Sequence, residues 1–259
     1  MLIDTHCHLD ASEFAGDRDA LIEAGRAAGV SATVVPSVGP GNWVAVRECC
    51  RRYPGCYPAY GIHPLYIQQV EDGDLDALRA WIDAESRTSI PPVAVGEIGL
   101  DYFLPGQDLE RQEFLFLEQL KIAREFDLPV LLHVRRAVDS VLKCLRRVRV
   151  RGGIAHAFNG SLQQAEALAA LNFKLGLGGA MTYSGSHRIR RLAATLPVAS
   201  LVLETDAPDI PPSWIAGKRN TPRELVAIAE TLSQLRGLSR EDVASATSHN
   251  AREILKLDC

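Results

Sequence analysis

The sequence contains little of what marks a secreted, membrane-spanning or disulfide-stapled protein. Its six cysteines form no Cys-x-x-Cys pair, and in a chain of 259 residues they are typical of thiols in a reducing compartment. No apolar run reaches the roughly 18 residues that a membrane-spanning helix needs. The opening MLIDTH has an acid where a signal peptide would carry basic residues, so we expect a cytoplasmic protein that has no membrane span.

An excess of positive charge is also missing. The chain has 28 Lys and Arg against 32 Asp and Glu, which gives a net charge of -4. This balance excludes a protein that holds nucleic acid by charge alone. A phosphate-ester substrate would therefore need a local source of positive charge, and a metal ion could supply one.

Apolar strand-like runs rich in Val, Leu and Ile alternate with helix-like runs along the whole chain, as in ATVVPSV, LPVLLHV and FKLGLGG. Such runs are typical of parallel strands that are covered on both faces. About eight strand–helix units precede a last helix over 240–257, which predicts a TIM-type (β/α)8 barrel of the α/β class. A doubly wound open sheet is the alternative. No linker or low-complexity segment divides the chain, so we expect a single domain over 1–259, with the longest loop over 206–222.

The opening stretch MLIDTHCHLD places two histidines two residues apart. Residues i and i+2 of a strand share a face, so we expect His6 and His8 to point together where the first strand ends. Two neutral imidazoles side by side suit a metal ion. A polar network or a cap on the barrel floor is the alternative. Cys7 points the other way and is expected to pack against the helices.

Further histidines and carboxylates stand at the carboxyl ends of the predicted strands, where barrel enzymes carry their active sites. Nitrogen and oxygen donors from several strands suit one or two divalent cations. A carboxylate with two oxygens is the natural bridge between two ions, and Glu97 has that place. The predicted metal ligands are His6, His8, Glu97, His133, His156 and Asp206.

Plainer alternatives exist for these residues. His133 and His156, each closing an apolar strand, would singly be core histidines as often as ligands. Glu97 could pair with a cationic side chain, and Asp206 could cap a following helix.

Other polar residues near the strand ends leave two interpretations open. Glu204 shares a face with Asp206 by strand parity, and it either orients a ligand or forms a buried ion pair. His63 precedes a proline, and it either donates to a substrate phosphate or is structural. His187 and His249 fall in predicted helices and are expected at the surface or in packing.

Six motifs occur in order along the chain: IDTHCHLD, GIHP, VGEIGLDY, LPVLLHVRRA, HAFNGS and LETDAP. This ordered set, which extends to the final NAREIL, resembles the TatD-type metal-dependent hydrolases of the amidohydrolase-like barrel superfamily. The resemblance implies a TIM-like barrel, a divalent metal site and deoxyribonuclease activity, typically exonuclease action with Mg or Mn. By motif position it places the metal ligands on the same six residues that the strand ends indicate.

The sequence departs from the family pattern beside these ligands. Arg136, in HVRRA, stands where TatD proteins usually have an acid, and HAFNG has Ala157 and Asn159 where the family has HCFSG. The stretch FKLGLGGAMTY and the ending DAPDIPP are similar to an uncharacterised branch of the family. The changes spare the ligands and fall at the rim of the site, so they bear on substrate specificity.

We therefore predict a metal-dependent hydrolase, in the first place a deoxyribonuclease of the 3′–5′ exonuclease type. Glu97 and Asp206 are the predicted catalytic residues, with Asp206 taking a proton from the attacking water. His63, Arg135 and Arg219 are candidates for binding the phosphate. The expected cofactors are two divalent ions (Mg, Mn or Zn), and the expected partner is DNA or another phosphodiester, with no stable protein partner.

Two other functions remain open from the sequence. The same chemistry cleaves amides and esters, including aminoacyl esters on RNA, because a fold does not fix a substrate. A metal-bearing module in a nuclease complex, with weak activity or none, is the second. The intact set of predicted ligands argues against that second alternative.

Overall fold

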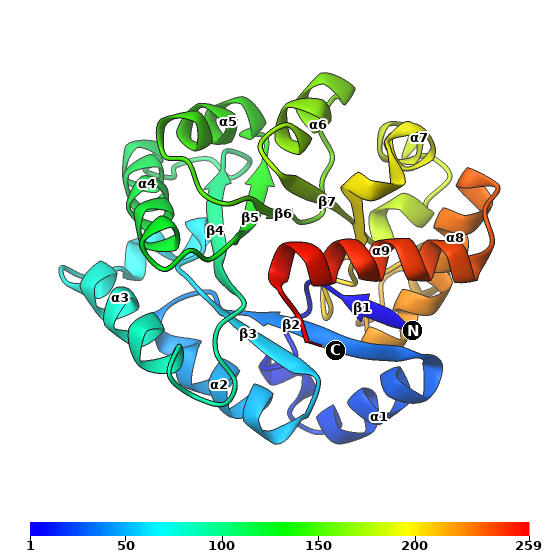
Figure 1. Ribbon diagram of the computed structural model, residues 1–259, viewed down its shortest axis with the longest axis horizontal. Coiled ribbons are helices and arrows are strands. Elements are labelled where there is room, and N and C mark those ends of the chain that lie inside the picture. Colours follow the sequence, from blue (N-terminus) through cyan, green and yellow to red (C-terminus); the bar gives the residue numbers. More distant parts are fainter. Residues whose placement is uncertain (259) are drawn as a thin grey trace.

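The computed structural model, which describes residues 1–258, has one sheet of eight parallel strands in the order β1 to β8 (Figure 1). The strands are β1 (Leu2–Asp4), β2 (Val30–Pro36), β3 (Cys56–Tyr60), β4 (Ala94–Asp101), β5 (Val130–Arg135), β6 (Gly153–Ala155), β7 (Phe173–Leu177) and β8 (Leu201–Leu203). The helices are α1 (Arg18–Ala28), α2 (Trp43–Arg52), α3 (Asp74–Glu85), α4 (Leu109–Glu125), α5 (Val138–Arg147), α6 (Leu162–Ala169), α7 (His187–Thr195), α8 (Leu225–Arg236) and α9 (Arg240–Leu255).

The first and last strands meet and close the sheet into a barrel. The Thr5 N–H donates to the Leu203 carbonyl at 3.1 Å, and the Asp206 N–H donates to the His6 carbonyl at 2.8 Å. The predicted (β/α)8 barrel is thus confirmed, and the open doubly wound sheet is wrong. A doubly wound sheet would reverse its strand order at a switch point, whereas these strands follow one another in chain order.

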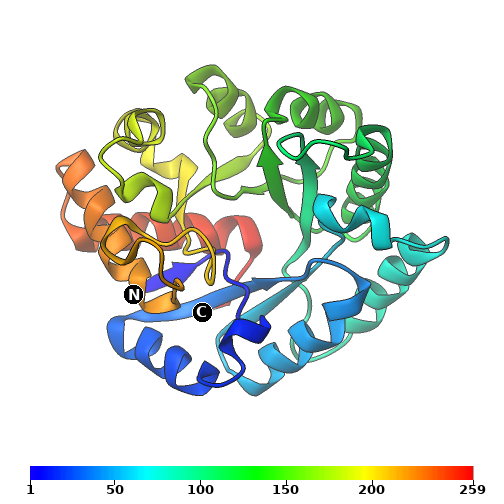
Figure 2. The same ribbon diagram turned by 180° about the vertical axis from the view of Figure 1, so that it is seen from behind.

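One end of the barrel is covered by α9, which crosses in front of the strands in Figure 1 and behind them in Figure 2. Asn250 Nδ2 donates to the carbonyl of Leu201 at 2.7 Å, and Ser248 Oγ donates to that of Met1 at 3.1 Å, so α9 covers the amino ends of the strands. Its apolar side chains complete the core inside the barrel, where Ile3, Val34, Leu131, Ile154 and Val202 pack with Ala251, Ile254 and Leu255. The carboxyl ends of the strands are left for the site.

The first strand is shorter than the sequence suggested, because it ends at Asp4 and not at the histidines. The Asp4 carboxylate accepts hydrogen bonds from the N–H of His6 at 3.3 Å and from the N–H and hydroxyl of Thr205 at 3.0 and 2.6 Å. The His6 N–H is therefore bonded to the Asp4 side chain and not to the backbone of a neighbouring strand. His6 and His8 still face one another, with ring centroids 5.1 Å apart.

The helices, the cysteines and the longest loop were also subjects of prediction. Within residues 1–258, no helix has the length and apolar character that crossing a membrane requires. The cysteines of this part are buried and free, and Cys7 is fully buried among the apolar residues of the helix layer, as expected. Cys259 lies outside the described residues. The segment 206–222 is a loop with short 3-10 turns, as predicted.

Gly99 lets β4 lie against β5 beside the site. Its φ is +150°, and an added Cβ would lie 1.9 Å from the carbonyl oxygen of His133. We expect Gly99→Ala to lower the free energy of unfolding by about 3 kcal/mol or more, because the strands must separate or the backbone must strain. Urea denaturation measures the change. Gly16→Ala, whose Cβ would meet nothing within 4 Å, is the control, and equal midpoints for both variants would contradict the account.

Candidate metal centre

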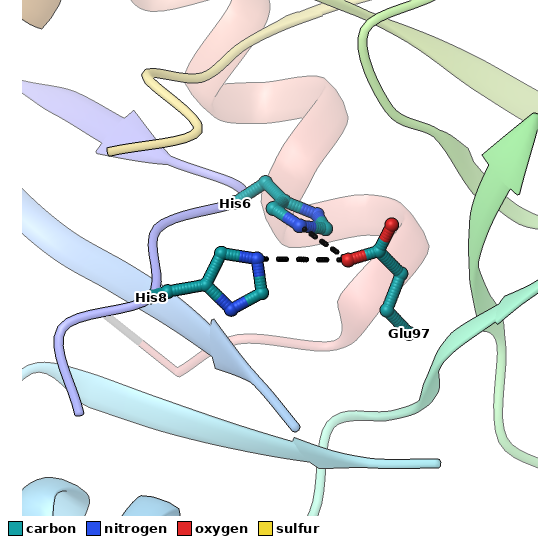
Figure 3. Close-up of side chains that lie close together, drawn as sticks. All are labelled: His6, His8 and Glu97. Carbon is teal, nitrogen blue, oxygen red and sulfur yellow. Dashed lines mark hydrogen bonds and ion pairs between the residues drawn. The ribbon is translucent and has the colours of Figure 1, made fainter. Parts of the chain in front are cut away.

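The six predicted ligands converge at the carboxyl end of the barrel around Glu97. Glu97 Oε2 lies 3.0 Å from His6 Nε2 and 3.6 Å from His8 Nε2 (Figure 3). Its other oxygen, Oε1, lies 2.8 Å from His133 Nδ1 and 2.9 Å from His156 Nε2. Each carboxylate oxygen therefore faces its own pair of imidazoles. The cation-pairing alternative for Glu97 is not what the structure shows, because its partners here are histidines.

Asp206 lies beside the same cluster. Its Oδ1 is 3.6 Å from His6 Nε2 and 3.8 Å from His8 Nε2. The helix-capping alternative is wrong, because the next helical turn begins only at Ser213. The backbone of Asp206 has a φ of +58°, in the left-handed region that non-glycine residues rarely adopt. This turn directs the carboxylate to the histidines of the first strand.

The imidazoles of the cluster pack against one another. The rings of His6 and His156 stack with centroids 4.0 Å apart, and those of His63 and His133 meet edge to face at 4.3 Å. The ring nitrogens of His133 and His156 face Glu97, so both rings belong to this polar cluster and not to the apolar core. The cluster has the buried nitrogen and oxygen atoms that a metal centre needs.

A divalent cation fits this donor set. Two donors on one tetrahedral ion, each about 2.1 Å from it, lie about 3.4 Å apart. The contacts of Glu97 and Asp206 with His6, His8, His133 and His156 span 2.8–4.0 Å. Three groups of donors have all their atoms within 4.8 Å of one another: His6 with His8 and Glu97, His6 with His156 and Asp206, and His63 with Glu97 and His133.

The electrostatics of the cluster centre on its buried carboxylates. Burial would lower the pKa of His156, but Glu97 foremost raises it to about 10, so a metal ion that binds this ring must displace its proton. Burial alone would raise the pKa of Glu97, but the neighbouring imidazoles, His156 foremost, hold it well below its usual range. Burial lowers the pKa of His6 to about 3, so His6 is neutral, which is the form that binds metals. Burial raises the pKa of Asp206, so its negative charge lacks compensation that a cation would provide.

His63 differs from the other histidines because a backbone hydrogen bond determines which of its ring nitrogens carries the proton. The Leu65 N–H donates to His63 Nδ1 at 3.1 Å, so the neutral ring carries its proton on Nε2. Burial lowers the pKa of His63, which favours this neutral form. Nε2 lies 3.3 Å from Glu97 Oε1, inside the site. A protonated nitrogen cannot bind a metal but can donate to an anion, so the geometry favours substrate binding over ligation.

Asp101 is a functional candidate that our reading of the sequence missed. Its Oδ2 accepts from His133 Nε2 at 3.0 Å, which leaves His133 Nδ1 directed at Glu97. The Gln112 side chain holds the Asp101 backbone, because its oxygen accepts from the Asp101 N–H at 2.9 Å and its amide group donates to the Asp101 carbonyl at 3.2 Å. Carboxylates that orient metal-binding histidines in this way are usual. Strand parity could have indicated Asp101 from the sequence, because Glu97 and Asp101 share a face of the run VGEIGLD.

Glu204 lies behind His156. Its Oε1 accepts the Ala157 N–H at 2.5 Å and is 3.8 Å from His156 Nδ1. Burial raises its pKa to about 8. Its place behind His156 Nδ1 suits either of its two expected roles, a carboxylate that orients the ring or the partner of a buried ion pair. Gly176 makes room for it, because a Cβ there would lie 2.1 Å from Glu204 Oε2.

The arginine candidates separate into one that lies at the site and one that does not. Arg135 lines a cleft with His133 and His156, and its guanidinium lies 3.6 Å from the centroid of the Phe103 ring. Arg219 instead pairs with Asp17 through both Nη atoms, at 3.1 and 2.5 Å, and lines neither cleft beside the centre. The expectation for Arg219 is therefore wrong. His187 and His249 are exposed, as expected.

Comparison with known proteins shows the family. The family model described as TatD related DNase matches residues 3–256. This chain belongs to the TatD family. The uncharacterized metal-dependent hydrolase YjjV of Escherichia coli (strain K12) is 41% identical over 96% of this chain and 95% of its own. The uncharacterized metal-dependent hydrolase YabD of Bacillus subtilis (strain 168) is 32% identical over 100% of both.

The solved structures agree with this TatD assignment. The crystal structure of YjjV, a TatD homologue from Escherichia coli, matches with a TM-score of 0.94 and 39% identity, over 99% of this chain and 98% of that one. TatD membership and the buried donors together assign the chain to the metal-dependent hydrolases.

The contact of Asp101 with His133 leads to a measurable expectation. Asp101→Asn keeps the shape of the side chain but weakens its hold on the His133 ring, so we expect divalent-metal affinity to fall by about tenfold to hundredfold. Isothermal titration of the metal-stripped protein with Mn measures this. Asp83→Asn, on the exposed face of α3, is the matched control. Equal affinities for the two variants would show that Asp101 does not act on the centre.

Proposed function

We propose that this TatD protein is a divalent-metal-dependent exodeoxyribonuclease that shortens DNA from its 3′ end. The observation that carries the proposal is the position of Glu97, which presents one oxygen to each of two imidazole pairs next to an arginine-lined cleft. The name of the matching family model supports DNA as the substrate.

We assign the metal ligands by the contacts of Glu97. His6, His8 and Asp206 would hold one ion with Oε2 of Glu97, and His133 and His156 would hold a second with Oε1. When bound, such ions supply Lewis acidity toward the phosphate and the attacking water. Mg, Mn and Zn all accept oxygen and nitrogen donors, so the choice of ion is left to the experiment.

Side chains of the protein would accept the proton of the attacking water and bind the phosphate. Asp206 is the proposed general base, because its carboxylate reaches the centre and burial raises its pKa. His63 would donate its Nε2–H to a phosphate oxygen. Arg135, beside His133, would bind a phosphate with its planar fork of donors.

Hydrolysis of single-stranded DNA by the metal-stripped protein tests the proposal. The DNA carries a 5′ label, and Mg, Mn or Zn is added back singly. We expect a ladder of products shortened stepwise from the 3′ end with at least one of these ions, and none in EDTA. An absence of shortening with every ion, together with turnover of nitrophenyl esters or aminoacyl esters, would overturn the nuclease proposal in favour of the ester hydrolases.

A further inference from the structure

Two clefts of opposite character open on either side of the proposed metal centre. The larger has a volume of about 900 Å³ and the smaller about 550 Å³. Both are lined in part by His133, His156 and Asp206, so they meet at the centre itself. A substrate whose reacting bond lies at the centre therefore extends one part into each cleft.

The larger cleft, here the basic cleft, is lined by three arginines, Arg135, Arg136 and Arg188, against a single carboxylate outside the metal centre, that of Asp139. Phe103 also lines it, and its ring has the guanidinium groups of Arg135 and Arg136 at 3.6 and 4.6 Å from its centroid. Phe103 is 39% exposed. Arginines beside an exposed aromatic ring are the usual means of holding a single strand, because the cations neutralise phosphates and the ring stacks on a base.

The smaller cleft, here the acidic cleft, has the opposite charge. Asp10, Glu13 and Asp209 line it, and no Lys or Arg is among its lining residues in the described part of the chain. Asp10 Oδ2 accepts from Asn42 at 2.9 Å, while its buried Oδ1 has no partner. Tyr66 adds an aromatic wall. Carboxylates accept hydrogen bonds from sugar hydroxyls but repel a phosphate, so this cleft suits an uncharged nucleoside.

We propose that this division of charge makes the protein selective for strand ends that carry a hydroxyl group. The phosphates of the strand lie in the basic cleft, and the terminal nucleoside, which has no phosphate beyond the scissile one, lies in the acidic cleft. A phosphate on that terminus would face Asp10, Glu13 and Asp209. The inference rests on the proposed function for its substrate, and on the two clefts for its selectivity.

The test compares three short single-stranded DNAs that differ only at their ends: hydroxyl at both, a 3′-phosphate, or a 5′-phosphate. Binding is measured in EDTA by fluorescence anisotropy with an internal label, and hydrolysis is measured with the active ion. We expect the 3′-phosphate to weaken binding and slow hydrolysis by about tenfold, and the 5′-phosphate to do neither. Equal behaviour of all three strands in both assays would overturn the inference.

Variants locate the effect in the acidic cleft. The double variant Glu13→Gln/Asp209→Asn removes two of its charges and is expected to reduce the tenfold preference to about threefold or less. The control Glu23→Gln/Glu241→Gln makes the same change of net charge at two exposed residues that line neither cleft, and should keep the preference. A preference that is the same in both double variants would overturn the role of the acidic cleft.

The outcomes separate this inference from the proposed function. A binding preference without hydrolysis by any ion would overturn the nuclease proposal and keep the division of charge. Hydrolysis without an end preference would keep the nuclease proposal and overturn the division of charge. Slowing by the 5′-phosphate alone would keep the division of charge and overturn the 3′ direction of the proposed reaction.

Discussion

Replacing Glu97 by glutamine is expected to reduce metal-dependent hydrolysis by about a thousandfold or more. Glu97 is buried, and its two oxygens contact His6 on one side and His133 and His156 on the other. Glutamine has nearly the same shape but offers one neutral oxygen, so the negative charge that both imidazole pairs share is lost. Removing a charge that stabilises the reacting groups inside a buried site changes rates by several orders of magnitude.

The control for Glu97→Gln is Glu110→Gln, the same change on the exposed first turn of α4. Bound metal is measured by mass spectrometry beside the initial rate, and thermal unfolding shows whether each variant is folded. We expect Glu97→Gln to be folded and to lose bound metal. Full activity with full metal content would contradict the bridging role.

Asp206→Asn is expected to lower turnover by about a hundredfold to ten-thousandfold, which is the usual contribution of a general base. The amide keeps an oxygen near His6 and His8, so we expect most of the bound metal to remain. The loss would then appear in kcat and little in metal content. Single-turnover hydrolysis beside metal analysis measures both, with Asp83→Asn as the exposed control.

The same two measurements on Asp206→Asn allow a contrary result. Loss of metal in proportion to activity would show that Asp206 acts only by holding the ion and not as a base. Activity equal to that of the control would remove Asp206 from the chemistry altogether.

The barrel could be predicted from the sequence because its signal is local and repeated. Each strand, such as Val130–Arg135, is a short apolar run, and each following helix has its own periodicity. The predicted ligands could be placed because parallel strands bring their carboxyl ends to one face of a barrel. Knowing that His133 and His156 each end a strand was enough to place them together.

What the sequence could not show depends on contacts between distant residues. The Asp4 carboxylate accepts the His6 N–H where the first strand ends, and it is held there by Thr205, which lies 201 residues away. Asp101 binds His133 from the neighbouring strand, and Arg219 pairs with Asp17 at the start of α1, 202 residues away. Strand parity places Asp101 on the same face as Glu97, but no local pattern identifies the partners themselves, because these contacts form only when the barrel closes.

The division of charge between the clefts was also hidden in the sequence. Arg135 and Arg136 are adjacent in the chain, but Arg188 joins them only through α7. Asp10 and Asp209 are separated by most of the chain and meet in one cleft because the first and last strands are neighbours. The net charge of -4 gave no indication of this separation.

The central claim is that the buried histidine and carboxylate cluster holds the divalent ions on which hydrolysis depends. The most direct measurement is metal content and DNA hydrolysis of the metal-stripped protein after titration with Mn, with His6→Ala alongside. We predict that the unmodified protein takes up about two equivalents and regains stepwise hydrolysis as they bind. His6→Ala should take up fewer and show no hydrolysis. Equal metal content and equal hydrolysis in the two proteins would contradict the claim.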